Sequence, residues 1–534
     1  MTQELTATNQ NDVADTPIEP EIPRRHWIAL FGGLLGAFMA ILDIQITNSS
    51  LKDIQGALSA TMDESSWIST SYLVAEMIAI PLSGWLSVAI GKRRYLTWTT
   101  IIFAVASVLC SLSWNMGSMI VFRAIQGFSG GALIPLAFSL VVQLLPLNKR
   151  AVGMALFGVT ATFAPSIGPT LGGWLTENFS WHYIFYINIP PAIALIFMVN
   201  YGLDDEPLRL DSLIKADWFG ITTMAIGLGC LEVVLEEGNR EEWFSSSFII
   251  TLSIISAISL IYFVINELQH KNPLVNLRLL KQSQFAMSCV AYLILGMALL
   301  GSIYVLPMYM IQIQGYNSLE IGEVLMWMGF PQLLIFPLVP KLTQIIKAKY
   351  LVFFGFSMFG ISCFVNTHMS YDFGGDQLIF SMLLRAIGSP FIMVPLSLVA
   401  MEEIQKHQVA DASTITNVLR NLGGAFSIAF IATLLDNKTR EHLGHIKETL
   451  TTVSTDGWYH LQQSAAMFVS KGSDPATAML QAKASLSMTM QRDAAIMAYN
   501  DVFFMMTCFL GFAAFMMFFV KSNSNPGSIE AGGH

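Results

Sequence analysis

Ionisable residues are scarce within the long apolar stretches of this chain, and the few that occur there are its candidates for chemistry. Asp43 lies about 16 residues into the first stretch, and Arg123 lies about five residues into the fourth. If successive stretches cross a membrane in opposite directions, both side chains lie in its outer third and can form a pair. A carboxylate beside a guanidinium binds a proton weakly and binds it more tightly once the two separate, so such a pair suits proton coupling. The alternative interpretation is a static ion pair between helices.

Glu76 is a third candidate for proton coupling. It lies near the middle of the second apolar stretch (SYLVAEMIAIPL), and no basic residue occurs within a helical turn of it in sequence. Removal from water favours the protonated form of a carboxyl group. We therefore expect Glu76 to carry a proton or to serve as the counter-ion of a cationic substrate. The alternative is a neutral, hydrogen-bonded packing residue.

Further polar residues interrupt the apolar stretches in both halves of the chain. Arg385 and Arg420 each lie roughly 13 Å from the end of their stretch at 1.5 Å per residue, and they either bind an anionic group or anchor helices. The residues expected to line a substrate cavity are Asn48, Gln126, Arg385, Asn417 and Arg420. Carboxylates nearer the outer ends of their stretches are expected mainly at the membrane interface, and these are Glu232, Glu236 and Glu323.

The composition indicates that an integral membrane protein positions these residues. Of 534 residues, 54% are hydrophobic and only 12% are charged, against about 25% charged in an average soluble domain. This excludes a water-soluble enzyme, and a net charge of -9 argues against a nucleic-acid partner. The five cysteines lie in apolar runs without the close pairings of metal or redox motifs. We therefore expect no catalytic residue, no metal and no cofactor.

Fourteen stretches are long enough to cross the roughly 30 Å hydrocarbon core of a bilayer as helices. The sequence therefore predicts an all-α integral membrane fold of 14 transmembrane helices. The predicted parts are a disordered cytoplasmic tail over 1–26, a six-helix bundle over 27–202, two inserted helices with cytoplasmic linkers over 203–282, a second six-helix bundle over 283–520, and a cytoplasmic tail over 521–534.

Two pairs of segments resemble each other at nearly the same offset and indicate a duplication. PLSGWLSVAIGKRRYL, which begins at Pro81, aligns with PLVPKLTQIIKAKYL, which begins at Pro337. RAIQGFSGGALIPLAFSLV, from Arg123, aligns with RAIGSPFIMVPLSLV, from Arg385. Two six-helix halves related by an axis along the membrane normal would hold a substrate near the membrane midplane, between the halves.

Lysine and arginine residues set the expected orientation. With the N-terminus in the cytoplasm, the short outer connections retain only Lys52 and Arg240, while the inner ones carry most basic residues. An even number of spans returns the C-terminus to the cytoplasm. The long connection over 436–497 then lies in the periplasm and is a candidate docking surface, with a solvated loop without a partner as the alternative.

The fifth stretch combines prolines and glycines in a way that predicts a hinge. Proline removes a backbone donor and glycine allows close helix approach, and the residues concerned are Pro165, Gly168, Pro169, Gly172 and Gly173. The glycines of the fourth stretch have no preceding strand and no phosphate-binding lysine, which argues against a nucleotide loop and an ATP-driven pump.

Several motifs resemble those of the 14-span drug:proton antiporters of the major facilitator superfamily, the EmrB/QacA type. LDIQITN (42–48) is similar to the family's first-span motif and RAIQG (123–127) to its fourth-span motif, in which the arginine is implicated in proton translocation. APSIGPTLGG (164–173) resembles the fifth-span antiporter motif, and WFSS, NPLVNLRLL and RNLGG match further stretches. The resemblance covers nearly the whole chain and implies the major facilitator fold.

The loop between the second and third spans departs from that family's motif. It keeps the small residues and the basic turn at Gly84, Gly91, Lys92, Arg93 and Arg94. Val88 and Ala89, however, stand in the part of the loop where the family motif has an acidic and a basic residue.

The resemblance implies a proton-driven exporter of hydrophobic compounds in the inner membrane of a Gram-negative cell. It also implies two partners, a periplasmic membrane-fusion adaptor (EmrA-like) and an outer-membrane channel (TolC-like). Some similar chains export one endogenous metabolite, such as a siderophore, and this stays open as the alternative. A membrane receptor without transport is a third hypothesis, which the intramembrane charges disfavour.

Overall fold

The computed structural model describes residues 22–209, 217–270, 273–405, 408–452 and 454–520, and within these ranges it contains helices and turns but no strands. In the same residues, 14 helices are long and apolar enough to cross a membrane. This architecture confirms the predicted fold class. The predicted tail over 521–534 and most of the predicted tail over 1–26 lie outside the described residues, and the first helix already begins at Arg24.

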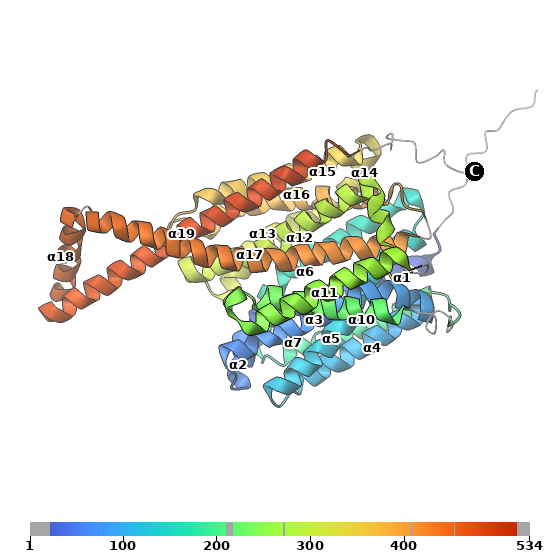
Figure 1. Cartoon of the computed structure of the whole chain (residues 1–534), viewed down its shortest axis with the longest axis horizontal. Helices are drawn as coiled ribbons and strands as arrows, with labels where there is room; N and C mark the ends of the chain where they lie inside the picture. Colours follow the sequence, from blue (N-terminus) through green and yellow to red (C-terminus); the bar gives the residue numbers. More distant parts are fainter. Residues whose placement is uncertain (1–21, 210–216, 271–272, 406–407, 453, 521–534) are drawn as a thin grey trace, which may run out of the picture.

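The helices fall into two halves, an inserted pair and an extension (Figure 1). The first half contains α1 (Arg24–Ser49), α2 (Leu51–Ala57), α3 (Met62–Ile90), α4 (Lys92–Ser111), α5 (Met116–Leu144), α6 (Leu147–Asn178), α7 (Tyr183–Tyr186) and α8 (Ile189–Gly202). The inserted pair is α10 (Trp218–Glu237) and α11 (Ser247–Gln269). The second half contains α12 (Ser283–Tyr309), α13 (Ser318–Ile335), α14 (Val339–Ile345), α15 (Ala348–Val365), α16 (Gly375–Met401), α17 (Val409–Thr452) and α19 (Pro475–Met516), with α18 (Ser454–Ser470) between the last two. Short 3-10 or π turns occur at Trp243–Ser245, Leu277–Lys281, Met310–Gln314, Phe336–Leu338 and Asn366–His368.

Local sequence signals set several of the helix ends. At the start of α3, the Thr61 hydroxyl accepts a hydrogen bond from the Glu64 backbone N–H (3.2 Å), and the Glu64 carboxylate accepts one from the Thr61 N–H (2.9 Å). This reciprocal capping satisfies donors that a helix start leaves unpaired. The helix ends at Ile90 and is followed by Gly91, whose φ of +89° is a conformation that other residues rarely adopt.

Equivalent helices pack in equivalent pairs in the two halves, as expected for a duplicated bundle. The pairs α1–α6, α3–α5 and α4–α8 of the first half correspond to α12–α17, α13–α16 and α15–α19 of the second. Between the halves, α6 packs on α13 and α16 along one seam. Along the other seam, α3 packs on α17, and the inserted helix α10 contacts both.

Most described residues of the connection over 436–497 are helical, whereas the sequence predicted only a long periplasmic connection there. α17 spans 44 residues and α19 spans 42, which is about 66 and 63 Å at 1.5 Å per residue. Both are roughly twice the hydrocarbon thickness of a bilayer, and Figure 1 shows them projecting beyond the bundle, where α18 joins them. Leu461 and Ala465 of α18 pack on Ala482 of α19. Hydropathy marks where such a helix leaves the membrane and not where it ends.

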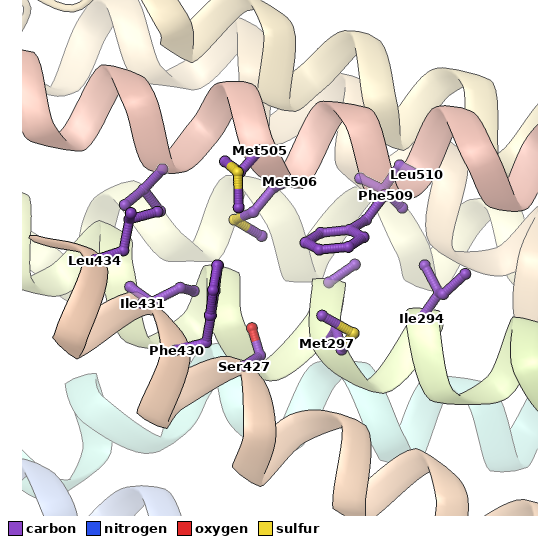
Figure 2. Close-up of a pocket in the computed structure, with 12 residues that line it drawn as sticks. Ile294, Met297, Ser427, Phe430, Ile431, Leu434, Met505, Met506, Phe509 and Leu510 are labelled. Carbon is purple, nitrogen blue, oxygen red and sulfur yellow. The ribbon is translucent and has the colours of Figure 1, made fainter. Parts of the chain in front are cut away.

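An apolar pocket of about 20 Å³ lies where α12, α17 and α19 meet within the second half. Figure 2 shows side chains of the three helices pointing toward one another, with methionines and phenylalanines prominent among them. Unbranched methionine side chains fill irregular gaps between helices. The pocket therefore belongs to the packing that holds α17 and α19 together inside the bundle.

Candidate functional site

Asp43 and Arg123 form an ion pair in the interior of the first half. The Arg123 Nη1 atom donates to Asp43 Oδ2 at 2.5 Å, and both residues are 1% exposed. The carboxylate comes from α1 and the guanidinium from α5, which pack against each other. The depth of each residue in its apolar stretch predicted this meeting.

Amide and hydroxyl groups complete the surroundings of the Asp43 carboxylate. Gln126 Nε2 donates to Asp43 Oδ1 at 3.0 Å and to Ser107 Oγ at 2.7 Å. Asn188 Nδ2 donates to Asp43 Oδ1 at 2.6 Å and to Ser107 Oγ at 2.9 Å. Sequence reasoning missed Asn188 and Ser107. Asn188 stands just before Ile189-Pro190-Pro191, a pattern that indicates a helix start, but its side chain makes no capping hydrogen bond and binds Asp43 and Ser107 instead, which no local pattern predicted.

Arg123 also joins the pair to α3. Its Nε donates to the Ile68 carbonyl at 3.2 Å, and its guanidinium carbon lies 4.3 Å from the centre of the Tyr72 ring. The Tyr72 hydroxyl in turn donates to the Ala40 carbonyl of α1 at 3.3 Å. The pair thus lies in one buried polar network that ties together α1, α3, α4, α5 and the start of α8, so a change of charge at Asp43 acts on all of them.

A central cavity of about 150 Å³ lies between the two halves. Its lining is mostly apolar and is contributed by helices of both halves and by α10. The polar and charged lining residues are Gln45, Asn48, Glu76, Thr162, Glu232, Glu236, Gln332, Arg420 and Asn421. A concave apolar site with few polar groups is typical of sites that bind small organic molecules.

The charges of the cavity are unequal in number. Three carboxylates, Glu76, Glu232 and Glu236, line it together with a single guanidinium, that of Arg420. Arg420 interacts electrostatically with Glu76, whereas the charged neighbours of Glu232 are Glu236 and Glu76. The expectation of an interfacial position for Glu232 and Glu236 was wrong, because Glu232 is 3% exposed and both residues face the cavity. Glu323, on α13, is exposed.

The structure separates the residues that were predicted to line a substrate cavity. Asn48 and Arg420 line the central cavity, and Asn48 accepts a hydrogen bond from the Ser69 hydroxyl at 2.6 Å. Asn417 lines a smaller pocket of about 20 Å³ that shares Arg420 with the central one. Gln126 lies in the Asp43 network.

Arg385 lies within the second half, between α15 and α16, and not at the central cavity. It is buried, its guanidinium carbon lies 5.1 Å from the centre of the Phe359 ring, and its three side-chain nitrogens have no hydrogen-bond partner in the described part of the chain. Arg385 is the counterpart of Arg123 in the repeat, but α12, the counterpart of α1, contains no acidic residue. Of the described residues, none forms an ion pair with Arg385.

The helix predicted to contain a hinge, α6, is continuous through Pro165 and Pro169. Pro165 lines the central cavity. A Cβ atom at Gly168 would lie 2.5 Å from Gln45 Cβ, and one at Gly172 would overlap Ser49, both on α1. These two glycines therefore allow α6 and α1 to pack closely.

The end of α10 is bound to both halves of the molecule. The Thr70 hydroxyl of α3 donates to Glu237 at 2.7 Å, and Arg240 pairs with Glu237 at 3.1 Å. On the other side, the Trp243 indole N–H donates to the Thr433 hydroxyl of α17 at 2.9 Å. These contacts fix α10 across the seam and hold its carboxylates in the cavity wall.

The basic turn at Lys92 to Arg94 is paired with the segment that follows α8. Lys92 lies 3.2 Å from Glu206, Arg94 lies 3.0 Å from Asp205, and Arg93 Nε donates to Asn200 at 3.0 Å. Acidic residues therefore reach this turn from another part of the first half.

The profile of the Major Facilitator Superfamily matches residues 33–428. The chain is 34% identical over 494 residues to the colistin resistance protein EmrB of Acinetobacter baumannii, covering 92% of this chain and 96% of that one. It is 28% identical over 504 residues to the multidrug export protein EmrB of Escherichia coli (strain K12), covering 94% and 96%. Among solved structures, the proton:xylose symporter XylE superposes with a TM-score of 0.59 at 12% identity, covering 95% of this chain and 99% of that one, and supports the fold alone.

Proposed function

The chain belongs to the Major Facilitator Superfamily, among its EmrB-type multidrug export transporters, and we propose that it exports hydrophobic or amphipathic compounds in exchange for protons. The observation that carries this proposal is the buried Asp43–Arg123 pair, whose carboxylate comes from a helix that also forms the cavity wall. α1 contributes Asp43 to the pair, and Gln45 and Asn48, within two turns of it, to the cavity. Movement of α1 therefore affects both groups at once.

Proton binding at Asp43 would change the balance of charge inside the first half. It would leave the Arg123 guanidinium buried without a counter-charge, and loss of one charge from a buried pair is destabilising by about 3–5 kcal/mol. A difference of this size shifts an equilibrium between two helix arrangements by a factor of more than about 100. In the other direction, a cavity rearranged by substrate would separate the pair and favour proton uptake.

The membrane orientation is part of the proposal. Arg25, Lys92 and Arg94 lie at the end of the bundle where α1 begins and α3 ends, which we assign to the cytoplasm. The extension formed by α17, α18 and α19 then lies in the periplasm of a bacterial inner membrane. Its length favours a contact with a periplasmic membrane-fusion adaptor (EmrA-like) and, through it, an outer-membrane channel (TolC-like).

Proton movement in energised everted vesicles tests the proposed exchange. Compounds of several unrelated classes, namely hydrophobic cations, weak acids and siderophore-like chelators, are expected to collapse the pH gradient in vesicles that contain the protein and not in vesicles without it. A response to one class alone would instead support export of a single metabolite. Silence toward every compound, with folded protein in the membrane, would contradict proton exchange.

Gly84 provides a separate test of the movement between the halves. A Cβ atom there would lie 3.0 Å from the Thr414 hydroxyl of α17, so α3 and α17 approach closely at this point. Overpacking costs about 1–3 kcal/mol, so Gly84→Val is expected to slow transport about tenfold in the vesicle assay. Gly511→Val is the matched control, because a Cβ at Gly511 has no neighbour within 4 Å. Equal rates for both variants and the unmodified protein would rule out closure at this contact.

A further inference from the structure

The inserted helix α10 brings two carboxylates to the central cavity. Glu232 and Glu236 are separated by four residues, which places them on one face of the helix. Both line the cavity, and the helix that carries them packs against α3 of one half and α17 of the other. One of the two inserted helices therefore contributes directly to the cavity.

Glu232 lacks the partners that a buried carboxylate normally has. It is 3% exposed, and its Oε2 atom accepts no hydrogen bond in the described part of the chain. Its charged neighbours are Glu236 and Glu76, which are also acidic. A buried carboxylate without a partner is unfavourable unless it binds a proton or a ligand supplies a positive charge.

The remaining cavity wall defines the rest of the ligand. Leu299, Leu300 and Ile303 of α12 line the cavity together with Met77 and Met328. These side chains favour contact with hydrocarbon and exclude a strongly hydrated ion. Arg420 also lines the cavity, but within the described part of the chain neither Glu232 nor Glu236 forms an ion pair with it or with another basic residue.

We propose that Glu232 and Glu236 form the cation-recognition site of the central cavity and select amphipathic organic cations. The cationic centre of the ligand lies between the two carboxylates, and its apolar part lies against α12. This inference rests on the proposed function and names the substrate class of the same cavity.

Binding to the purified full-length protein in detergent tests this site without any proton gradient. The probes are tetraphenylphosphonium, whose charge does not depend on pH, and triphenylphosphine oxide, an uncharged relative. Glu232→Gln is expected to weaken tetraphenylphosphonium binding at least about tenfold, which corresponds to about 1.4 kcal/mol. Binding of the uncharged probe is expected to stay within about twofold.

Two further variants distinguish a site from a folding effect. Glu232→Asp keeps the carboxylate and is expected to retain the preference for the cation, while Glu323→Gln removes an exposed carboxylate outside the cavity and is expected to bind both probes normally. Unchanged tetraphenylphosphonium affinity in a Glu232→Gln/Glu236→Gln double variant would overturn the inference. If that double variant still exports compounds, the cation site is wrong but the proposed function stands. If the unmodified protein binds the cation but moves no protons, the proposed function is wrong but the cation site stands.

Discussion

Asp43→Asn is expected to reduce substrate-driven proton movement to the level of vesicles that lack the protein. Asparagine can still accept a hydrogen bond from Arg123 in place of the carboxylate, but it cannot bind and release the exchanged proton. Because a broken buried pair costs about 3–5 kcal/mol, we expect a lower melting temperature with substrate binding retained. Asp53→Asn is the matched control, since Asp53 is an exposed carboxylate on α2.

A double variant, Asp43→Asn combined with Arg123→Gln, separates proton coupling from a static ion pair. It places two neutral amides opposite each other, and replacing both charges together avoids the single buried charge that either substitution leaves behind. If the pair is purely structural, the double variant should recover both stability and transport. Recovery of stability alone, with proton movement still absent, is the result expected for a coupling pair. Full transport by either the single or the double variant would contradict the role of Asp43.

The sequence predicted those features that depend only on how far a residue lies along a helix axis. Residue counts within apolar stretches give depth in the membrane, so the meeting of Asp43 and Arg123 followed from their sequence positions. Depth does not define which side of a helix faces a neighbour. Gln126, three residues after Arg123, was therefore expected at a substrate cavity, although its amide lies in the Asp43 network.

The inserted helices illustrate the same limit. Glu232 and Glu236 are near the outer end of α10, and depth alone suggested contact with water. Their burial results from the docking of α10 across the seam between α3 and α17, a long-range arrangement that no local pattern encodes. The spacing of four residues was the available signal, because it placed both carboxylates on one helix face.

The sequence predicted the duplication of the six-helix bundle, but it did not predict that equivalent positions in the two halves have different partners. Arg123 and Arg385 occupy matching positions, yet only the first half has an acidic residue on the facing helix. Arg385 consequently packs against Phe359, while Arg123 binds Asp43. The duplicated bundle thus retains the arginine in both halves and a charged pair in one.

The second large effect is expected at the extension formed by α17, α18 and α19. Substitutions there should abolish the resistance of whole cells but leave transport by everted vesicles unchanged. Leu480 and Met488 of α19 are 67% and 70% exposed and lie beyond the length of helix that a membrane can cover. Exposed apolar residues at this position suit a protein contact. Leu480→Asp combined with Met488→Asp should lower the resistance of whole cells to that of cells without the transporter, since one interface hot spot contributes about 2 kcal/mol or more. Transport by everted vesicles should stay within about twofold.

A charge-matched variant distinguishes loss of an apolar contact from a general effect of added charge. Ser485→Asp combined with Thr489→Asp adds the same two charges to exposed positions of α19 whose centre lies about 120° around the helix from that of Leu480 and Met488, since successive residues are about 100° apart. Cells with this variant are expected to keep their resistance. If the Leu480/Met488 variant also protects cells normally, the extension does not dock an adaptor through this surface. If it fails in vesicles as well, the extension instead stabilises the bundle, because α17 packs on α12 and α19 packs on α15 within the second half.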